Sequence, residues 1–344
     1  MSRSALSHRR PVLAVATSAG NAIHLFDGLT YDPIGDLQVT AQPHELAADT
    51  AEGLLYISHT YRSGIYTEPG EKAHEISVAD PFRRELLEVV SLAPQEAPHG
   101  LALDARRHRL YTTVEEGPVG NGAVVALDTV SRRPVGRIDV GAGRPHWFAA
   151  TPDGRKGYAT NKADPFISVV DLAGGRLVGR IPAPFGTEEV AISRDGRYAY
   201  VAGPALRNRR TAPSGAAMLI VIDTATDEVV DRIPLEAPGR PVHVAPDGRV
   251  LVGLVRTDRD GGPADGRLAV YSPDAHLLQY SVPTGRSPIT IRTTPAGDRA
   301  FVANLRSGTV TVVDLESGTE IRTLDIDPEQ PDRNQRAHGI AYLE

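Results

Sequence analysis

The stretch APHGLALD at residues 97–104 recurs three more times along the chain with small changes. The copies are QPHELAAD (42–49), RPHWFAAT (144–151) and RAHGIAYL (336–343). Each copy is a short apolar run with a histidine near its start, which is typical of a buried β-strand that the chain enters from a turn. A strand that repeats in this way indicates a repeat protein, and the whole repeat therefore decides the fold.

A longer unit surrounds each of these strands. A second apolar strand starts about twelve residues after the histidine, as in GLLYISH (53–59) and HRLYTTV (108–114), and is followed by a variable loop and two more strands. Aligning the units on the second strand gives one residue per unit at the same position, which we call the slot. The seven slots are His44, His99, His146, Glu188, Arg240, Ile289 and His338. Successive slots are 55, 47, 42, 52, 49 and 49 residues apart, and 50 across the termini.

Seven units of four short strands, with Gly, Pro and Asp turns and no helical period, predict an all-β fold, a seven-bladed β-propeller. The last unit stops after its first strand, and residues 11–39 supply the three strands that it lacks. The C-terminal strand is therefore expected to complete the N-terminal blade, which leaves no open sheet edge. We expect one domain over residues 1–344, with residues 1–10 as a flexible tail. The sequence has no spare strands for the alternatives, an eight-bladed propeller or an open β-solenoid.

The amino-acid composition limits the classes of partner and cofactor. A formal net charge of −6 provides no broad basic surface, so nucleic acid is excluded as a default partner. Without cysteine, any metal must be held by His, Asp, Glu or backbone oxygen. The basic N-terminus imitates a secretory signal, but its apolar run is short and is needed as a strand. The sequence thus predicts a cytoplasmic protein without a membrane partner, leaving the oligomeric state open, with a monomer as one option.

In a propeller the slots ring one mouth of the central channel. Four consecutive blades then present histidines (His338, His44, His99 and His146), which a divalent cation would hold neutral through their lone pairs. Several imidazoles with a carboxylate suit Zn, Fe, Cu or Ni. The alternative is that duplication copied the histidines and that each one hydrogen-bonds a neighbouring blade.

Two further slots are expected to be catalytic. Glu188 is a candidate general base, a fifth ligand or an anchor for a histidine N–H. Arg240 is a candidate partner for an anionic substrate group, or else a salt-bridge partner of Glu188 or Glu189. The register around Arg240 leaves open that His243 or Val242 faces the channel instead.

Long polar loops follow the second strands on the face that carries the slots. Loops on a rigid scaffold commonly bind ligands, although an ordinary surface role is the alternative for each residue. The candidate substrate-binding residues are His59, Tyr61, Arg62, Glu115, Asn161, Lys162 and Arg207.

Residues 157–181 (GYATNKADPFISVVDLAGGRLVGRI) and 301–324 (FVANLRSGTVTVVDLESGTEIRTL) resemble the YVTN-type propeller repeat, and the resemblance covers essentially the whole chain. This group includes lactonase-like propellers, a streptogramin lyase and the propeller domain of nitrous oxide reductase, in which histidines at the channel mouth hold copper. The resemblance implies a metal-dependent enzyme that acts on a small polar organic substrate, as a lyase or a lactonase-type hydrolase. A metal-dependent oxidase or oxygenase and a non-catalytic propeller that binds a ligand or a protein are the alternatives.

Overall fold

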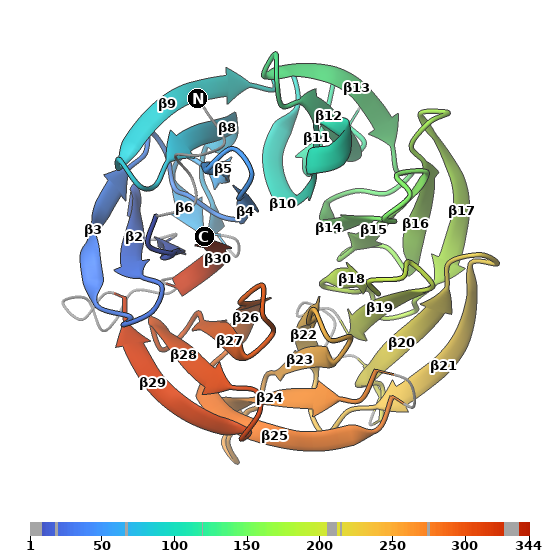
Figure 1. Cartoon of the computed structure of the whole chain (residues 1–344). Coiled ribbons are helices and arrows are strands. Elements are labelled where there is room, and N and C mark those ends of the chain that lie inside the picture. The colour runs from blue at the N-terminus through green and yellow to red at the C-terminus, as the bar shows by residue number, and fades with distance from the viewer. Residues whose placement is uncertain are drawn as a thin grey trace.

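The computed structural model describes residues 9–17, 20–65, 68–118, 120–204, 212–213, 215–273, 276–326 and 337–344. Seven four-stranded antiparallel sheets stand around a central axis as the blades of a propeller (Figure 1). The predicted all-β, seven-bladed fold is confirmed. Most of the predicted tail at residues 1–10 lies outside the described residues.

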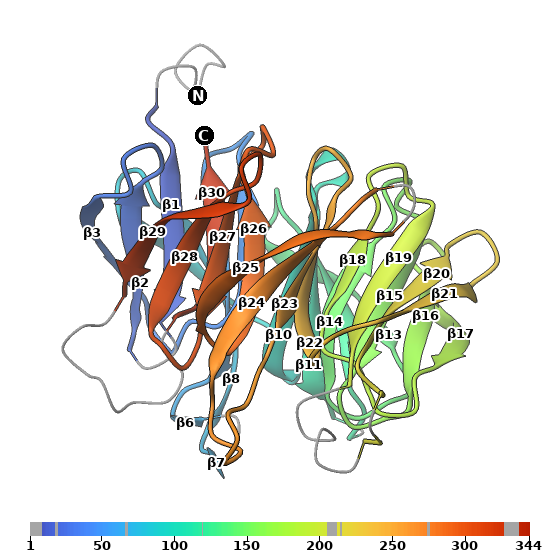
Figure 2. The ribbon, with the colours of Figure 1, turned by 90° about the horizontal axis from the view of Figure 1, so that it is seen from below.

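Each blade runs from an inner strand at the axis to an outer strand at the rim, and blade 1 joins the two ends of the chain. Blade 1 contains β30 (Ala337–Leu343), β1 (Val12–Thr17), β2 (Ala22–Asp27) and β3 (Pro33–Gln38). Blade 2 contains β4 (Leu46–Asp49), β5 (Leu54–Tyr61), β8 (Lys72–Asp80) and β9 (Glu85–Ser91), and the small hairpin of β6 (Gly64–Ile65) and β7 (Glu68–Pro69) projects from it (Figure 2). Blade 3 contains β10 (Glu96–Asp104), β11 (Arg109–Glu116), β12 (Ala123–Asp128) and β13 (Arg133–Asp139).

The remaining four blades follow the same order without interruption. Blade 4 contains β14 (Pro145–Ala150), β15 (Lys156–Asn161), β16 (Phe166–Asp171) and β17 (Arg176–Pro182). Blade 5 contains β18 (Val190–Ile192), β19 (Tyr198–Gly203), β20 (Met218–Asp223) and β21 (Glu228–Pro234). Blade 6 contains β22 (Gly239–Val244), β23 (Val250–Leu254), β24 (Asp265–Tyr271) and β25 (Leu278–Arg286). Blade 7 contains β26 (Pro288–Thr293), β27 (Arg299–Asn304), β28 (Thr309–Asp314) and β29 (Thr319–Asp325).

In the described part of the chain, helical structure is limited to the short 3₁₀ segment η2 (Ala105–Arg107), which connects β10 to β11. No helix in that part is long and apolar enough to cross a membrane.

The ring closes through β1 and β30, as the sequence predicts. These strands pair antiparallel, with Val12 opposite Leu343 and Val15 opposite Ile340. The C-terminal strand therefore becomes the inner strand of a blade whose other strands come from the N-terminus (Figure 1). Closure of this kind removes the two sheet edges that an open array would expose.

The hydrophobic core lies between neighbouring blades. Buried Tyr56 and Ile76 of blade 2, for example, pack with Leu101 and Val125 of blade 3 in one cluster. Similar clusters join the other pairs of adjacent blades. Because each blade buries one face on each neighbour, no blade is stable alone, and the fold depends on the complete ring.

Tight turns between the third and fourth strands follow from an aspartate at the end of the third strand. Asp128 accepts hydrogen bonds from the backbone N–H groups of Val130 and Ser131 at 3.2 and 2.8 Å. Six blades use this device, through Asp27, Asp80, Asp128, Asp171, Asp223 and Asp314. The recurrent Asp in the sequence is therefore turn chemistry.

Glycine follows the slot histidine in blades 1 and 3 because the next inner strand comes very close. A Cβ on Gly339 would lie 2.6 Å from the backbone oxygen of His44, and one on Gly100 would lie 2.9 Å from that of His146. Gly339 also donates its N–H to His44 O at 3.0 Å. Glycine here permits the close approach of backbone to backbone.

We predict that Gly339→Ala destabilises the protein by roughly 1–3 kcal/mol, because the new methyl group has to push two inner strands apart. Gly136→Ala is the matched control, since a Cβ there meets only Ala126 Cβ at 3.9 Å. Urea denaturation of both variants measures the difference. Equal free energies of unfolding for the two variants would show that the close contact between Gly339 and the backbone of His44 tolerates a side chain.

Candidate functional site

The slots form a ring around the axis, as predicted, but the ring is buried. The slot side chains of blades 1 to 6 belong to residues that are between 0 and 7% exposed: His338, His44, His99, His146, Glu188 and Arg240. Ile289 of blade 7 is 3% exposed and belongs to a hydrophobic cluster. The ring therefore lies within the channel and not on an open rim.

The four imidazoles form a continuous arc. Ring centroids are 3.9 Å apart for His338 and His44, 4.1 Å for His44 and His99, and 4.0 Å for His99 and His146. His44 Nε2 and His99 Nε2 share a hydrogen bond of 2.7 Å, so one of the two nitrogens is a donor and the other an acceptor. His146 donates from Nδ1 to the backbone oxygen of Glu188 at 2.8 Å. Both hydrogen bonds join neighbouring blades, which is the kind of contact that the structural alternative requires.

Burial keeps these imidazoles neutral. Burial lowers the pKa of His44 well below its usual value, and the neighbouring His338 lowers it further. The pKa of His99 is lowered by burial first and then by His146 and His44. The pKa values of His146 and His338 are lowered for the same primary reason. Neutral imidazoles retain the lone pairs that a metal ion binds.

Hydroxyl groups fix the backbone beneath the arc. Thr113 donates to His146 O at 2.8 Å and accepts from the N–H of Gly100 at 3.1 Å, so it connects the slots of blades 3 and 4. Ser58 makes the same two bonds between blades 2 and 3, and Thr160 between blades 4 and 5. Blades 5 and 7 carry Ala202 and Ala303 at the corresponding position. The hydroxyl bridges therefore lie under the histidine arc.

We predict that Thr113→Val lowers the free energy of unfolding by about 1–3 kcal/mol, because two buried backbone groups lose their partner. Thr290→Val is the control, since Thr290 is equally buried but its hydroxyl has no hydrogen-bond partner among the described residues. Urea denaturation should find the control unchanged within about 0.5 kcal/mol. A Thr113 variant as stable as the control would refute the bridging role.

Glu45, which the sequence analysis did not select, belongs to the site. Its residue is 1% exposed, and its Oε1 lies 3.0 Å from His338 Nδ1 without the alignment of a hydrogen bond. Its Oε2 has no hydrogen-bond partner among the described residues. Burial raises the pKa of Glu45 to about 8, against the opposing charge of Arg292. Glu45 directly follows a slot residue, whereas blades 1 and 3 have glycine at that position. This departure from the repeat was the sequence signal that could have identified Glu45.

One nitrogen from each of His44 and His338 and one carboxylate oxygen of Glu45 lie within 4.8 Å of one another. These donors come from blades 1 and 2 and therefore meet only because the ring closes. His99 contacts His44 from the other side and orients its ring. That all four histidines ligate one metal stays a prediction, and the geometry adds Glu45 to the candidates.

The two expected catalytic residues contact each other. Glu188 Oε2 lies 3.2 Å from Lys162 Nζ and 3.8 Å from Arg240 Nε. For Arg240 this is the salt-bridge alternative of the sequence analysis. His243, the other candidate in that blade, contacts Thr293 Oγ1 at 3.1 Å, further along the strands from the slots. Arg240 therefore occupies the slot of blade 6.

A second polar layer lies next to the slots. Glu189 is 2% exposed, and its pKa is raised well above the usual value by burial first and by Glu45 second. Arg292 of blade 7 places its guanidinium 5.5 Å from the centroid of the Trp147 ring of blade 4. An arginine that reaches from blade 7 to blade 4 spans the channel, so this layer closes the axis behind the ring.

The predicted substrate-binding residues separate into two groups. His59 is buried within its own blade, where its ring nitrogens contact Ala41 O at 3.1 Å and Ser77 Oγ at 2.7 Å. Asn161 likewise donates from Nδ2 to Ser168 Oγ at 3.0 Å. Both residues therefore fix the end of a second strand through contacts inside the blade.

The other candidates lie closer to charged partners. Glu115 Oε2 accepts from Tyr61 OH at 3.5 Å and from Arg144 Nε at 3.3 Å. Arg62 forms ion pairs with Glu71 and Glu75. Lys162 joins Glu188, as described above, and Arg207 lies outside the described residues. Lys162 thus contacts a slot side chain.

We predict that His59→Asn reduces the acid sensitivity of the fold. Burial lowers the pKa of His59 to about 4, whereas an unfolded histidine has a pKa of about 6.5. Between these values the unfolded chain binds a proton that folded His59 does not, so stability falls as the pH is lowered, by up to about 3 kcal/mol. Asparagine fits this position, because Asn161 and Asn304 make the equivalent bonds in blades 4 and 7.

Urea denaturation between pH 6.5 and 4 measures this effect. The loss of stability on acidification should be smaller in the variant than in the parent protein, while both have similar stability near pH 7. The same loss in both proteins would contradict the role given to His59.

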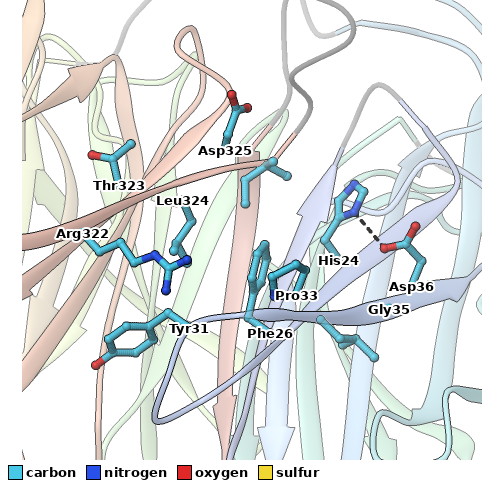
Figure 3. Close-up of a pocket in the computed structure, with 12 residues that line it drawn as sticks. His24, Phe26, Tyr31, Pro33, Gly35, Asp36, Arg322, Thr323, Leu324 and Asp325 are labelled. Atoms are coloured by element: carbon cyan, nitrogen blue, oxygen red, sulfur yellow. Dashed lines mark hydrogen bonds and ion pairs between the residues drawn. The ribbon is translucent and has the colours of Figure 1, made fainter.

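A separate pocket of about 250 Å³ lies at the seam of blades 1 and 7 (Figure 3). Its walls include His24 and Asp36, whose side chains are 2.9 Å apart, and Arg322 of β29. These residues lie on the third and fourth strands of their blades, away from the axis. The pocket is thus separate from the axial ring.

Fold and site together define a seven-bladed β-propeller of four-stranded blades with a buried arc of imidazoles at its axis. This class agrees with the YVTN-type repeat that the sequence resembles. No family model matches the chain.

Comparisons with known proteins agree on the fold. The uncharacterized protein YncE of Salmonella typhi is 25% identical over 251 residues, which are 69% of this chain and 63% of YncE. Antigen Lp49 of Leptospira interrogans is 26% identical over 252 residues, 70% of this chain and 51% of Lp49. The chain thus spans less than two thirds of the length of these relatives.

Two solved structures resemble the whole propeller. A chain of hydrazine synthase from Kuenenia stuttgartiensis superposes with a TM-score of 0.71 at 20% identity, over 88% of this chain and 92% of that one. A functionally unknown protein from Desulfotomaculum acetoxidans gives a TM-score of 0.70 at 11% identity, over 97% of this chain and 99% of that one. At these identities the likeness shows the fold alone.

Proposed function

We propose that the axial ring binds a divalent transition metal and that the protein is a metal-dependent enzyme for a small polar organic substrate. The observation that carries the proposal is the convergence of His44, His338 and Glu45 within 4.8 Å. His338 Nδ1 lies 3.0 Å from Glu45 Oε1, and Nδ1 and the other carboxylate oxygen, Oε2, are both buried without a hydrogen-bond partner among the described residues. A cation between the two side chains would satisfy both atoms.

The donor types support a limited set of metals. Two imidazoles and one carboxylate hold catalytic zinc and also non-haem iron, and imidazole suits copper and nickel as well. A metal ion binds neutral imidazoles, and burial keeps the imidazoles of His44 and His338 neutral. Bound metal would act as a Lewis acid toward a substrate oxygen or a water molecule.

The surrounding residues have separate roles in this proposal. His99 holds the ring of His44 through the 2.7 Å hydrogen bond between their Nε2 atoms. Arg240 and Lys162 hold the Glu188 carboxylate beside the arc, where it can accept or return a proton. Arg240 contributes a positive charge that favours an anionic group on a substrate.

Lyase or hydrolase chemistry is our first assignment, because it follows from the resemblance to lactonase-like and streptogramin-lyase-like propellers. An oxidase or oxygenase is the second, and the two-histidine, one-carboxylate composition favours it, since that set is typical of non-haem iron oxygenases. The likeness to hydrazine synthase concerns the fold and adds no reaction to the proposal.

We predict that protein purified without a histidine tag carries, or takes up on incubation with Zn, Fe(II), Cu or Ni salts, about one metal ion per chain. Replacing His44 or His338 by Ala should reduce metal affinity by at least about tenfold, because each supplies one donor. His24→Ala is the matched control, since that histidine lies on β2 beside Asp36. Elemental analysis after gel filtration measures the stoichiometry.

If the His44 and His338 variants bind metal as well as the parent protein does, the metal site lies away from the axis. Failure of all four metals to bind would overturn the metal centre and leave a ligand-binding propeller.

A further inference from the structure

Lysine is rare in this chain, and one lysine is buried at the axis. The 344 residues include three lysines, Lys72, Lys156 and Lys162, against 34 arginines. Lys72 and Lys156 are partly buried and form ion pairs between blades, with Glu116 and Asp227 respectively. Lys162 is 4% exposed and places Nζ 3.2 Å from Glu188 Oε2. Among the three, it alone lies beside the slots.

A purely structural role does not account for the choice of lysine. Arg240 already lies beside the same Glu188 oxygen, at 3.8 Å, so the carboxylate has a cation without Lys162. For a permanent buried ion pair arginine is better suited, since it stays charged and binds carboxylates in a bidentate manner. Lysine differs from arginine in that it can lose a proton and then act as a nucleophile.

The surroundings make the Lys162 ammonium easier to deprotonate than an exposed lysine. Burial lowers the pKa of Lys162 to about 8, against the opposing charge of Glu188, and Arg240 adds to the lowering. A desolvated lysine next to another cationic group is an established way to activate an amine toward carbonyl compounds. The adjacent carboxylate supplies the proton acceptor and donor that imine formation needs.

We propose that Lys162 is a carbonyl-reactive amine that forms an imine with a small aldehyde or ketone, with Glu188 as its proton-transfer partner. Glu188 takes one proton from the Lys162 ammonium, and the neutral nitrogen adds to the carbonyl carbon to form a C–N bond. The carbonyl oxygen is protonated and leaves as water while the nitrogen lone pair forms the C=N bond. The ammonium and the carbonyl compound are thus converted to a protonated imine and one water molecule.

This inference goes beyond the proposed metal centre, because it names carbonyl compounds as the ligand class and uses the Glu188 side of the ring. It does not require bound metal. The two proposals therefore fail separately, one by absence of metal binding and the other by absence of imine formation.

The test is reductive trapping of the full-length protein with acetaldehyde and sodium cyanoborohydride at pH 7, before and after treatment with EDTA. Reduction of the imine leaves an N-ethyl lysine, which peptide mapping by mass spectrometry locates. Lys72 and Lys156 are internal controls in the same molecule. We expect Lys162 to be ethylated more than about tenfold faster than either, with or without EDTA.

Two variants separate chemistry from structure. Glu188→Gln should slow ethylation of Lys162 by about tenfold or more, because the proton-transfer partner is lost. Glu116→Gln removes the nearer of the two carboxylate partners of Lys72, the other being Glu96, and should leave the rate at Lys162 unchanged. Lys162→Arg keeps a cation beside Glu188 and should be folded, by circular dichroism, but lack the fast ethylation.

Ethylation of Lys162 no faster than that of Lys72 and Lys156 in the parent protein would overturn the proposal, whatever the variants do. So would an unchanged rate at Lys162 in a folded Glu188→Gln variant, because the assigned partner would then have no part in the reaction.

Discussion

The pairing of β1 with β30 is the contact on which the axis depends. It places His338 between Ile289 and His44 and so completes a ring whose members are far apart in sequence. The candidate metal donors make this dependence concrete, because His338 comes from the C-terminal strand while His44 and Glu45 precede the first strand of blade 2. Gly339 permits the seam, since no side chain fits between it and the backbone of His44.

Periodicity was sufficient to predict most of the fold. Blade number, strand order and closure all follow from a repeat of about 49 residues, in which the N-terminal unit lacks its first strand and the C-terminal unit has only that strand, because a propeller is nearly one-dimensional in its contacts. The slot ring was predictable for the same reason, since equivalent positions on inner strands must meet at the axis. Blade 6 also has Arg240 in its slot, although the register between its first and second strands differs by one residue from the register in blade 7.

The partners of individual side chains were not predictable. Glu45 was missed because its contact with His338, from the other end of the sequence, leaves no periodic signal; the one available sign was that two other blades have glycine at its position. His59 and Asn161 were selected because polar residues before a loop resemble ligand-binding residues. Their buried partners, Ser77 and Ser168, occupy equivalent places on the third strand and show a repeated structural bond instead.

Burying polar side chains at the axis costs free energy, and these side chains are not spread evenly around the ring. Apolar side chains would fill a propeller channel more cheaply than neutral imidazoles, a protonated carboxyl group and a buried ion pair. Blade 7 shows that the fold permits this, because Ile289 occupies its slot within a hydrophobic cluster. The polar residues are instead gathered on one continuous arc, with metal-type donors at one end and the Lys162–Glu188–Arg240 group at the other. His99 and His146 join these two ends through ring contacts, so the imidazoles fill the space between the metal-type donors and the Lys162–Glu188–Arg240 group without a gap. That continuity distinguishes the arc from six separately buried polar groups.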